Sequence, residues 1–152
     1  MRTLEQWMSE YSESHQNRTN QIIHKFCVPL IVFSVLGYFY VIPVPSAFES
    51  TAHLNWCTLA MFGALIFYAL LSLKMFAAML VETVIMYLMI AHLHQTIGHL
   101  NFIYFNSAIF VLSWVVQLVG HKIEGKKPSF AKDLAFLLIG PLWVLRSLGI
   151  KN

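Results

Sequence analysis

Long apolar runs separated by short polar segments make up most of the chain. A helix needs about 20 apolar residues, within a range of roughly 17 to 25, to cross the hydrocarbon core of a bilayer. The runs of this length are residues 26–42, 54–73, 75–93 and 102–119. This pattern predicts an all-α protein, a multi-pass transmembrane helical bundle with four membrane-spanning helices.

The residues before the first run have the pattern of an amphipathic helix. Within residues 1–25, apolar side chains recur at steps of three and four, which places them on one face of a helix. They are Leu4, Trp7, Met8 and Tyr11. Such a face either lies on the membrane surface or packs against the rest of the protein, and the pattern fits both alternatives.

A shorter apolar segment, residues 134–145, lies near the C-terminus and contains Gly140 and Pro141. A segment of this length is more typical of an interfacial or re-entrant helix than of a span. We therefore expect four spans plus this segment, with five spans as the alternative. The chain is interpreted as a single membrane-embedded domain, residues 1–152. Its parts are the amphipathic helix 1–25, the four spans within 26–119, and a basic loop with the hydrophobic C-terminal segment within 120–152.

Composition supports a membrane protein and argues against nucleic-acid binding. Hydrophobic residues make up 58% of the chain and charged residues only 11%, compared with about 25% charged residues in a soluble domain. The ten basic residues form no run interleaved with aromatic residues, as a nucleic-acid-binding surface would have. The chain also lacks the GxSxG, Walker and dinucleotide-binding motifs. We expect lipid, and no nucleic acid, among its partners.

Lysine and arginine alternate with the apolar runs. They precede the first run, occur between the second and third, and follow the fourth, but are absent from residues 43–53 and 94–101. Because basic residues favour the cytoplasmic side, we predict a cytoplasmic N-terminus, with the first run as an uncleaved anchor in a bacterial cytoplasmic membrane, or in the endoplasmic reticulum of a eukaryote. The basic residues that support this orientation are Arg2, Arg18, Lys25, Lys74, Lys122, Lys126, Lys127 and Lys132.

This orientation divides the seven histidines into two groups. His15, His24 and His121 fall on the predicted cytoplasmic face. An 18-residue helix is about 27 Å long, so histidines at opposite ends of a span cannot bind one ion. His15 and His24 are nine residues apart, which puts them on opposite sides of a straight helix. Both can face one ion only if the helix breaks between them, and residues 16–20 are rich in Asn and Thr, which favour helix caps.

A second polar cluster lies at the end of the fourth run. Gln117, His121 and Glu124 are spaced four and three residues apart, so they line one helix face. Two or three histidines plus a carboxylate are typical ligands of the non-haem Fe(II) that activates oxygen, and Zn²⁺ accepts similar ligands. Polar residues at a helix end are also often simply solvated. Spacing alone therefore leaves iron, zinc and no metal open.

Other polar residues offer weaker candidate sites. The HxxxH and HxxHH boxes of membrane desaturases are absent. His53, His92, His94 and His99 lie on or near the opposite face, where interfacial histidines are the simpler interpretation. Glu82 lies inside the third run, where an acid is costly and often functional, although a protonated or paired acid near the membrane surface fits equally.

Two stretches of the chain resemble a known family. They are YSESHQNRTNQIIHKFCVP (residues 11–29) and WVVQLVGHKIEGKKP (residues 114–128). Together they resemble the Mpo-type 2-hydroxy fatty acid dioxygenases, and the resemblance covers nearly the whole chain, including the layout of the spans. Fungal members of that family act in the endoplasmic reticulum during phytosphingosine breakdown, and many bacteria carry short relatives. The resemblance implies an Fe(II)-dependent α-oxidation, in which a 2-hydroxy fatty acid reacts with O₂ and loses its carboxyl carbon.

The resemblance also implies a ligand set. Carried onto this sequence, the iron ligands are His15, His24 and His121, the same three that the charge pattern places on one face. For the remaining ligand, the spacing favours Glu124 and then Asn20. Further residues are expected to orient the ligands or contact substrate, with the two lysines attracting its carboxylate. They are Tyr11, Asn17, Asn20, Gln117, Lys126 and Lys127.

Two other functions use the same residues. One is a zinc-dependent membrane lipid hydrolase, which needs no O₂. The other is a non-catalytic lipid-binding membrane protein with a structural metal. The sequence leaves open the acyl chain length, the physiological substrate, the fourth ligand, whether the chain forms a homo-oligomer, and whether residues 134–145 cross the membrane.

Overall fold

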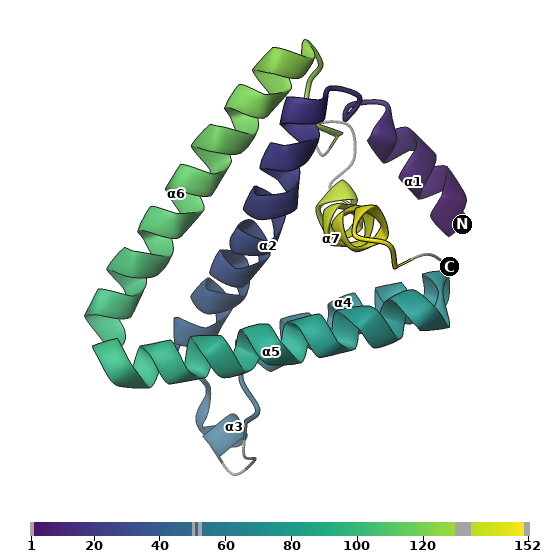
Figure 1. Cartoon of the computed structure of the whole chain (residues 1–152). Helices are drawn as coiled ribbons and strands as arrows, with labels where there is room; N and C mark the ends of the chain where they lie inside the picture. Colours follow the sequence, from purple (N-terminus) through teal and green to yellow (C-terminus); the bar gives the residue numbers. More distant parts are fainter. Residues whose placement is uncertain (1, 50, 52, 130–134, 151–152) are drawn as a thin grey trace. The chain divides into compact units, whose positions relative to one another are not determined.

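The computed structural model describes residues 2–49, 51, 53–129 and 135–150. These residues form helices and contain no strand, which confirms the all-α prediction (Figure 1). Lys132 and Leu134, which belong to the predicted basic loop and C-terminal segment, lie outside the described residues. The helices are α1 (Leu4–Ser12), α2 (Arg18–Val41), α3 (Ser46–Glu49), α4 (Trp56–Leu71), α5 (Leu73–Ile97), α6 (His99–Glu124) and α7 (Phe136–Ser147).

Three of these helices are long and apolar enough to cross a membrane, namely α2, α5 and α6. The helix in the second predicted span, α4, has only 16 residues and is therefore about 24 Å long. The helix within the predicted span 54–73 is therefore shorter than expected. Among the described residues, three helices and not the predicted four have the length of a full span. At 12 residues, α7 is also too short to cross as a helix.

Local capping explains why α4 is short. The side chain of Asn55 accepts a hydrogen bond from the Thr58 amide at 3.0 Å, and the Thr58 hydroxyl accepts one from the Asn55 amide at 3.0 Å. This reciprocal cap starts the helix at Trp56. At the other end, Ser72 has an extended backbone and ends α4. The Ser72 hydroxyl then caps α5 by accepting a hydrogen bond from the Met75 amide at 3.4 Å. A single residue therefore joins two helices that lie side by side (Figure 1).

The described residues fall into two compact units. One unit contains residues 32–110, with a core that includes Phe33, Cys57, Ile90 and Phe102. In this unit the side-chain amide of Asn106 donates a hydrogen bond to the carbonyl oxygen of Ser34 at 2.9 Å. A Cβ on Gly37 would lie 2.5 Å from the Asn106 Oδ1 atom, so glycine is needed for this close approach between α2 and α6.

The other unit contains residues 1–31 and 111–152. Its amphipathic helix α1 buries Leu4, Trp7, Met8 and Tyr11, and it packs against α7. The Trp7 and Phe136 rings meet edge to face with centroids 5.0 Å apart. Of the two alternatives for this apolar face, the structure therefore supports packing within the protein.

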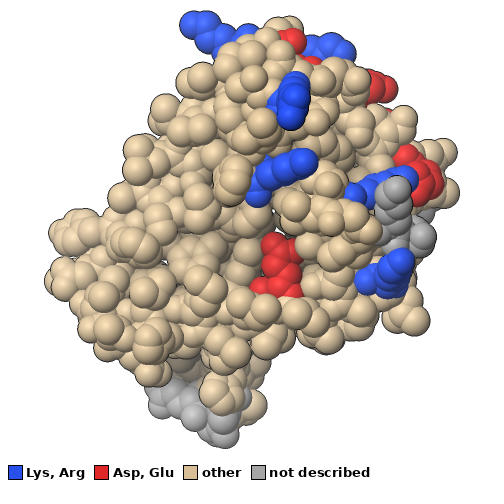
Figure 2. Space-filling view, viewed as in Figure 1, with Lys and Arg blue, Asp and Glu red and all other residues tan. Residues whose placement is uncertain are grey.

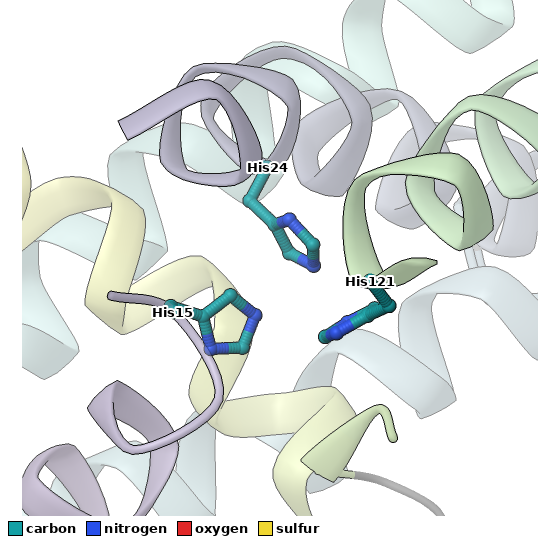
Figure 3. A group of neighbouring side chains, drawn as sticks. All are labelled: His15, His24 and His121. Atoms are coloured by element: carbon teal, nitrogen blue, oxygen red, sulfur yellow. The ribbon is translucent and has the colours of Figure 1, made fainter. Parts of the chain in front are cut away.

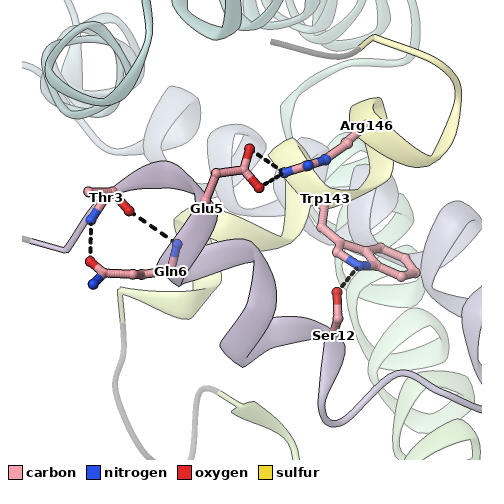
Figure 4. A network of polar contacts seen from close by, with 6 residues as sticks. All are labelled: Thr3, Glu5, Gln6, Ser12, Trp143 and Arg146. Carbon is pink, nitrogen blue, oxygen red and sulfur yellow. Dashed lines mark hydrogen bonds and ion pairs between the residues drawn. The ribbon is translucent and has the colours of Figure 1, made fainter.

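Polar contacts also join α1 to α7 (Figure 4). Thr3 and Gln6 form a reciprocal cap that starts α1. The Arg146 Nη1 atom donates to both carboxylate oxygens of Glu5 at 2.9 Å. The Trp143 indole donates to the Ser12 hydroxyl at 3.1 Å. These contacts hold α7 in place over the end of α1, close to His15.

The surface agrees with a membrane environment. Charged side chains are sparse on the face shown in Figure 2. Large apolar side chains on the long helices are exposed, for example Phe26 at 70% and Tyr104 at 72%. A water-soluble monomer rarely exposes so many large apolar side chains in contiguous patches. The membrane orientation inferred from lysine and arginine remains a prediction.

Candidate metal centre

The site is built around a break between α1 and α2. α1 ends at Ser12 and α2 begins at Arg18, so the predicted break between His15 and His24 is confirmed. It lies at residues 13–17, slightly earlier than the predicted residues 16–20. Asn17 starts α2, because its side-chain oxygen accepts hydrogen bonds from the Thr19 amide at 2.9 Å and the Asn20 amide at 3.4 Å.

The break brings three histidines together (Figure 3). His15 lies on the turn, His24 on α2 and His121 on α6. The ring centroids are 4.3 Å apart for His15 and His24, 5.1 Å for His15 and His121, and 4.8 Å for His24 and His121. One ring nitrogen from each lies within 4.8 Å of the others. All three side chains are buried, with at most 5% of each residue exposed.

Backbone carbonyls orient two of these rings. The Nδ1 atom of His15 lies 2.6 Å from the Tyr11 carbonyl oxygen, and that of His24 lies 3.0 Å from the Asn20 carbonyl oxygen. Because a carbonyl can only accept, each Nδ1 carries the proton and each Nε2 offers a lone pair. A metal-bound histidine usually donates its second ring N–H in this way.

The remaining nitrogens suit a bound cation. His15 Nε2 and His121 Nδ1 are buried and lack a hydrogen-bond partner among the described residues. Leaving a buried polar atom unpaired costs about 1–3 kcal/mol, and coordination of a metal ion would satisfy both atoms. The donor set of three clustered imidazoles therefore fits a metal such as zinc, iron, copper or nickel.

Burial keeps His15 and Tyr11 uncharged. Desolvation lowers the pKa of His15 to about 4, and the hydrogen bond to the Tyr11 carbonyl opposes this effect only in part. Tyr11 is itself buried and stacks on His15 with ring centroids 4.1 Å apart. Its burial raises the phenol pKa well above the usual value. At neutral pH both groups are uncharged, and neutral imidazole is the form that binds metal.

Glu124, the expected fourth ligand, has other partners. One of its carboxylate oxygens accepts a hydrogen bond from the Gln16 amide at 2.8 Å. The other accepts from the Asn17 amide at 2.8 Å and from the Asn20 side-chain amide at 3.1 Å. The cluster of ligand atoms found among the described residues consists of the three histidines alone.

The other predicted residues take several positions. Asn20 is fully buried, and besides bonding Glu124 its side chain donates to the Ser14 carbonyl at 3.1 Å. Gln117 is buried one turn before His121 on α6. Lys126 and Lys127 are both exposed, and the Lys126 ammonium donates to the Glu13 carbonyl at 2.7 Å.

The histidines of the other group and Glu82 belong to the unit of residues 32–110. His94 Nε2 and His99 Nδ1 are 3.1 Å apart on the exposed ends of α5 and α6. Glu82 is half-buried on α5, and one of its oxygens lacks a partner among the described residues.

Sequence reasoning missed three residues that contact the centre. The Gln21 side chain donates to the His15 carbonyl at 2.9 Å. The Trp143 ring lies 5.3 Å from the His15 ring. Gly120 allows Asn20 to approach α6, because a Cβ there would collide with Asn20. A glycine directly before a candidate ligand in a long apolar helix is a signal of such a close approach between helices, whereas nothing in the sequence pointed to Trp143.

The family assignment extends over almost the whole chain. The model of the family described as 2-hydroxy-palmitic acid dioxygenase Mpo1-like matches residues 1–151. The chain belongs to this family. The match confirms the resemblance carried by residues 11–29 and 114–128. Neither a curated protein nor a solved structure matches the chain. At the level of its name, the Mpo1-like family is one of dioxygenases that act on a 2-hydroxy fatty acid.

Proposed function

We propose that the protein is an Fe(II)-dependent dioxygenase that converts a 2-hydroxy fatty acid to a fatty acid one carbon shorter. The observation that carries this proposal is the buried cluster of His15, His24 and His121 in a chain of the Mpo1-like family. These three residues would hold the iron. Bound iron would supply the redox chemistry that activates O₂.

The protein's own residues prepare this chemistry by excluding water and fixing the ligands. The Tyr11 ring covers one face of His15, and the carbonyls of Tyr11 and Asn20 set the direction of two imidazoles. Burial lowers the pKa of His15 and keeps its imidazole neutral, so protons compete weakly for its lone pair at pH 7. The exposed Lys127 is the remaining candidate for attracting the substrate carboxylate, because Lys126 bonds Glu13.

A groove between α1 and α7 gives the substrate a route toward this closed centre. It has a volume of about 430 Å³. Trp143 forms one wall, and the same ring lies 5.3 Å from His15. The substrate headgroup approaches along the groove and the acyl chain stays in the lipid. The residues that line the groove are Glu5, Met8, Ser9, Ser12, Trp143, Arg146 and Ser147.

The test is turnover of a long-chain 2-hydroxy fatty acid by protein purified without oxygen in detergent and loaded with Fe(II). We expect a fatty acid one carbon shorter, formed only with both iron and O₂. His24→Ala and His121→Ala should abolish it, while His92→Ala, which removes an exposed histidine of the other unit, should not.

The zinc hydrolase is the competing function, because three histidines also form catalytic zinc sites. Product formation without O₂, or activity with Zn²⁺ and none with Fe(II), would overturn the dioxygenase proposal. If folded, iron-loaded protein forms no shortened fatty acid in the presence of O₂, the proposed reaction is wrong.

A further inference from the structure

Two oppositely charged side chains at the end of α6 contact the turn that carries His15. Glu124 is the last residue of α6, and its carboxylate accepts hydrogen bonds from the Gln16 and Asn17 amides. Lys126, two residues later, donates to the Glu13 carbonyl at 2.7 Å. These contacts join residues more than 100 positions apart in the chain, and they lie on both sides of His15.

The charges match the helix ends that they contact. The first amides of a helix lack partners within it and carry partial positive charge, and the last carbonyls carry partial negative charge. The Glu124 carboxylate meets the beginning of α2, and the Lys126 ammonium meets the end of α1. Each side chain therefore places its charge beside a helix end of opposite partial charge and bonds a backbone group of the turn between α1 and α2.

Gly125 makes this arrangement possible. It follows α6 with φ at 72°, a conformation that favours glycine, and its amide donates to the His121 carbonyl at 3.0 Å. The reversal at Gly125 ends the helix between Glu124 and Lys126. Both side chains can then reach the same turn, one from the last residue of the helix and the other from the loop.

We propose that Glu124 and Lys126 form a clamp that positions His15 and His24 relative to His121, and that Glu124 acts through this clamp and is not a metal ligand. The inference rests on the proposed metal centre. Both Glu124 oxygens already accept hydrogen bonds, from three N–H groups in total. Moving the carboxylate onto a metal would leave the Gln16 and Asn17 amides without this partner.

Asn20 links the clamp to the ligands. Its side chain donates to Glu124 at 3.1 Å, and its backbone carbonyl accepts from His24 Nδ1 at 3.0 Å. On the other side, the Ser14 carbonyl accepts from the same Asn20 amide. One buried residue thus connects the end of α6, the His15 turn and the His24 ring.

The test measures two properties of each variant, its affinity for Co²⁺ and the visible spectrum of the bound Co²⁺. The spectrum reports which atoms bind the metal directly. The variants are Glu124→Gln and Lys126→Met, with Lys122→Met, at another exposed lysine, as the matched control. We expect both clamp variants to bind Co²⁺ about 10–100-fold more weakly with the wild-type spectrum, and the control to bind as wild type does. The double variant Glu124→Gln/Lys126→Met should lose less affinity than the two single losses combined, because both act on one turn.

Each contrary result points to a different failure. If Glu124→Gln changes the Co²⁺ spectrum while Lys126→Met does not, Glu124 is a ligand and the clamp is wrong. If both variants lower only the melting temperature of the metal-free protein and leave Co²⁺ affinity unchanged, the contacts are structural and the positioning role is wrong. If the His24→Ala variant binds Co²⁺ as tightly as the wild type does, the proposed metal centre is wrong, and the proposed clamp is wrong with it.

Discussion

Asn20 on α2 lies directly against Gly120 on α6, the residue before His121. A Cβ at position 120 would collide with the Asn20 side-chain oxygen and would lie 3.3 Å from two carbon atoms of Ile23. Because Gly120 has no side chain, the helix bearing His24 can approach the helix bearing His121 closely. This contact couples helix packing to the geometry of the candidate metal centre.

We expect Gly120→Ala to weaken metal binding and to destabilise the protein. Overpacking of this kind costs about 1–3 kcal/mol, and relief by separating α2 from α6 would move His121 away from His24. Metal content after purification and the melting temperature measure the two effects. Gly63→Ala is the matched control, because a Cβ at that position in α4 would have no atom within 4 Å apart from the neighbouring backbone of its own helix. Equal metal content in the two variants would contradict the coupling.

The metal-free protein should lose stability as the pH falls from about 6.5 to 4. Burial lowers the pKa of His15 from 6.5 in the unfolded chain to about 4. The unfolded state therefore binds more protons in this range, and stability rises with pH there. Chemical denaturation across pH 4–8 measures the slope. His15→Gln removes this group, so its slope should be shallower than that of the wild type, and identical slopes would show that His15 titrates normally.

Tyr11 should matter for its ring more than for its hydroxyl. The ring stacks on His15 and is buried, and the hydrogen bond to His15 comes from the Tyr11 backbone. Tyr11→Phe should therefore keep metal affinity within a few-fold of wild type. Tyr11→Ala should lose about 3–5 kcal/mol of stability, as other large aromatic truncations do. If Tyr11→Phe abolishes turnover while retaining iron, the Tyr11 hydroxyl contacts substrate. This is one of the two roles that the sequence analysis expects for Tyr11.

Local patterns in the sequence predicted much of this architecture. Apolar runs predicted the helices, and the nine-residue spacing of His15 and His24 required the break that the structure contains. The grouping of these two with His121 followed from the alternation of basic residues along the chain and from the family resemblance. All three inferences use helix periodicity, span length or a recognisable motif.

Contacts between distant segments were not accessible in this way. The spacing of His121 and Glu124 placed them on one helix face, but it could not show that Glu124 meets the Gln16 amide 108 residues away. The length of α4 also depends on details that hydropathy does not register. Asn55 and Ser72 cap and break the helix inside a run that is apolar on average.

Blocking the groove between α1 and α7 should slow turnover without removing the metal. Ser9 is an exposed residue of the groove lining, and Ser9→Trp would fill part of its volume of about 430 Å³. Because Ser9 is on the outer face of α1, we expect the iron content to stay at the wild-type level and kcat/KM for a 2-hydroxy fatty acid to fall at least tenfold. Glu10→Trp places the same bulk on the next residue, outside the groove lining, and should leave kcat/KM near wild type. Equal activity in both variants would show that substrate reaches the histidines by another route, whereas loss of iron in Ser9→Trp alone would show that the groove supports the metal centre itself.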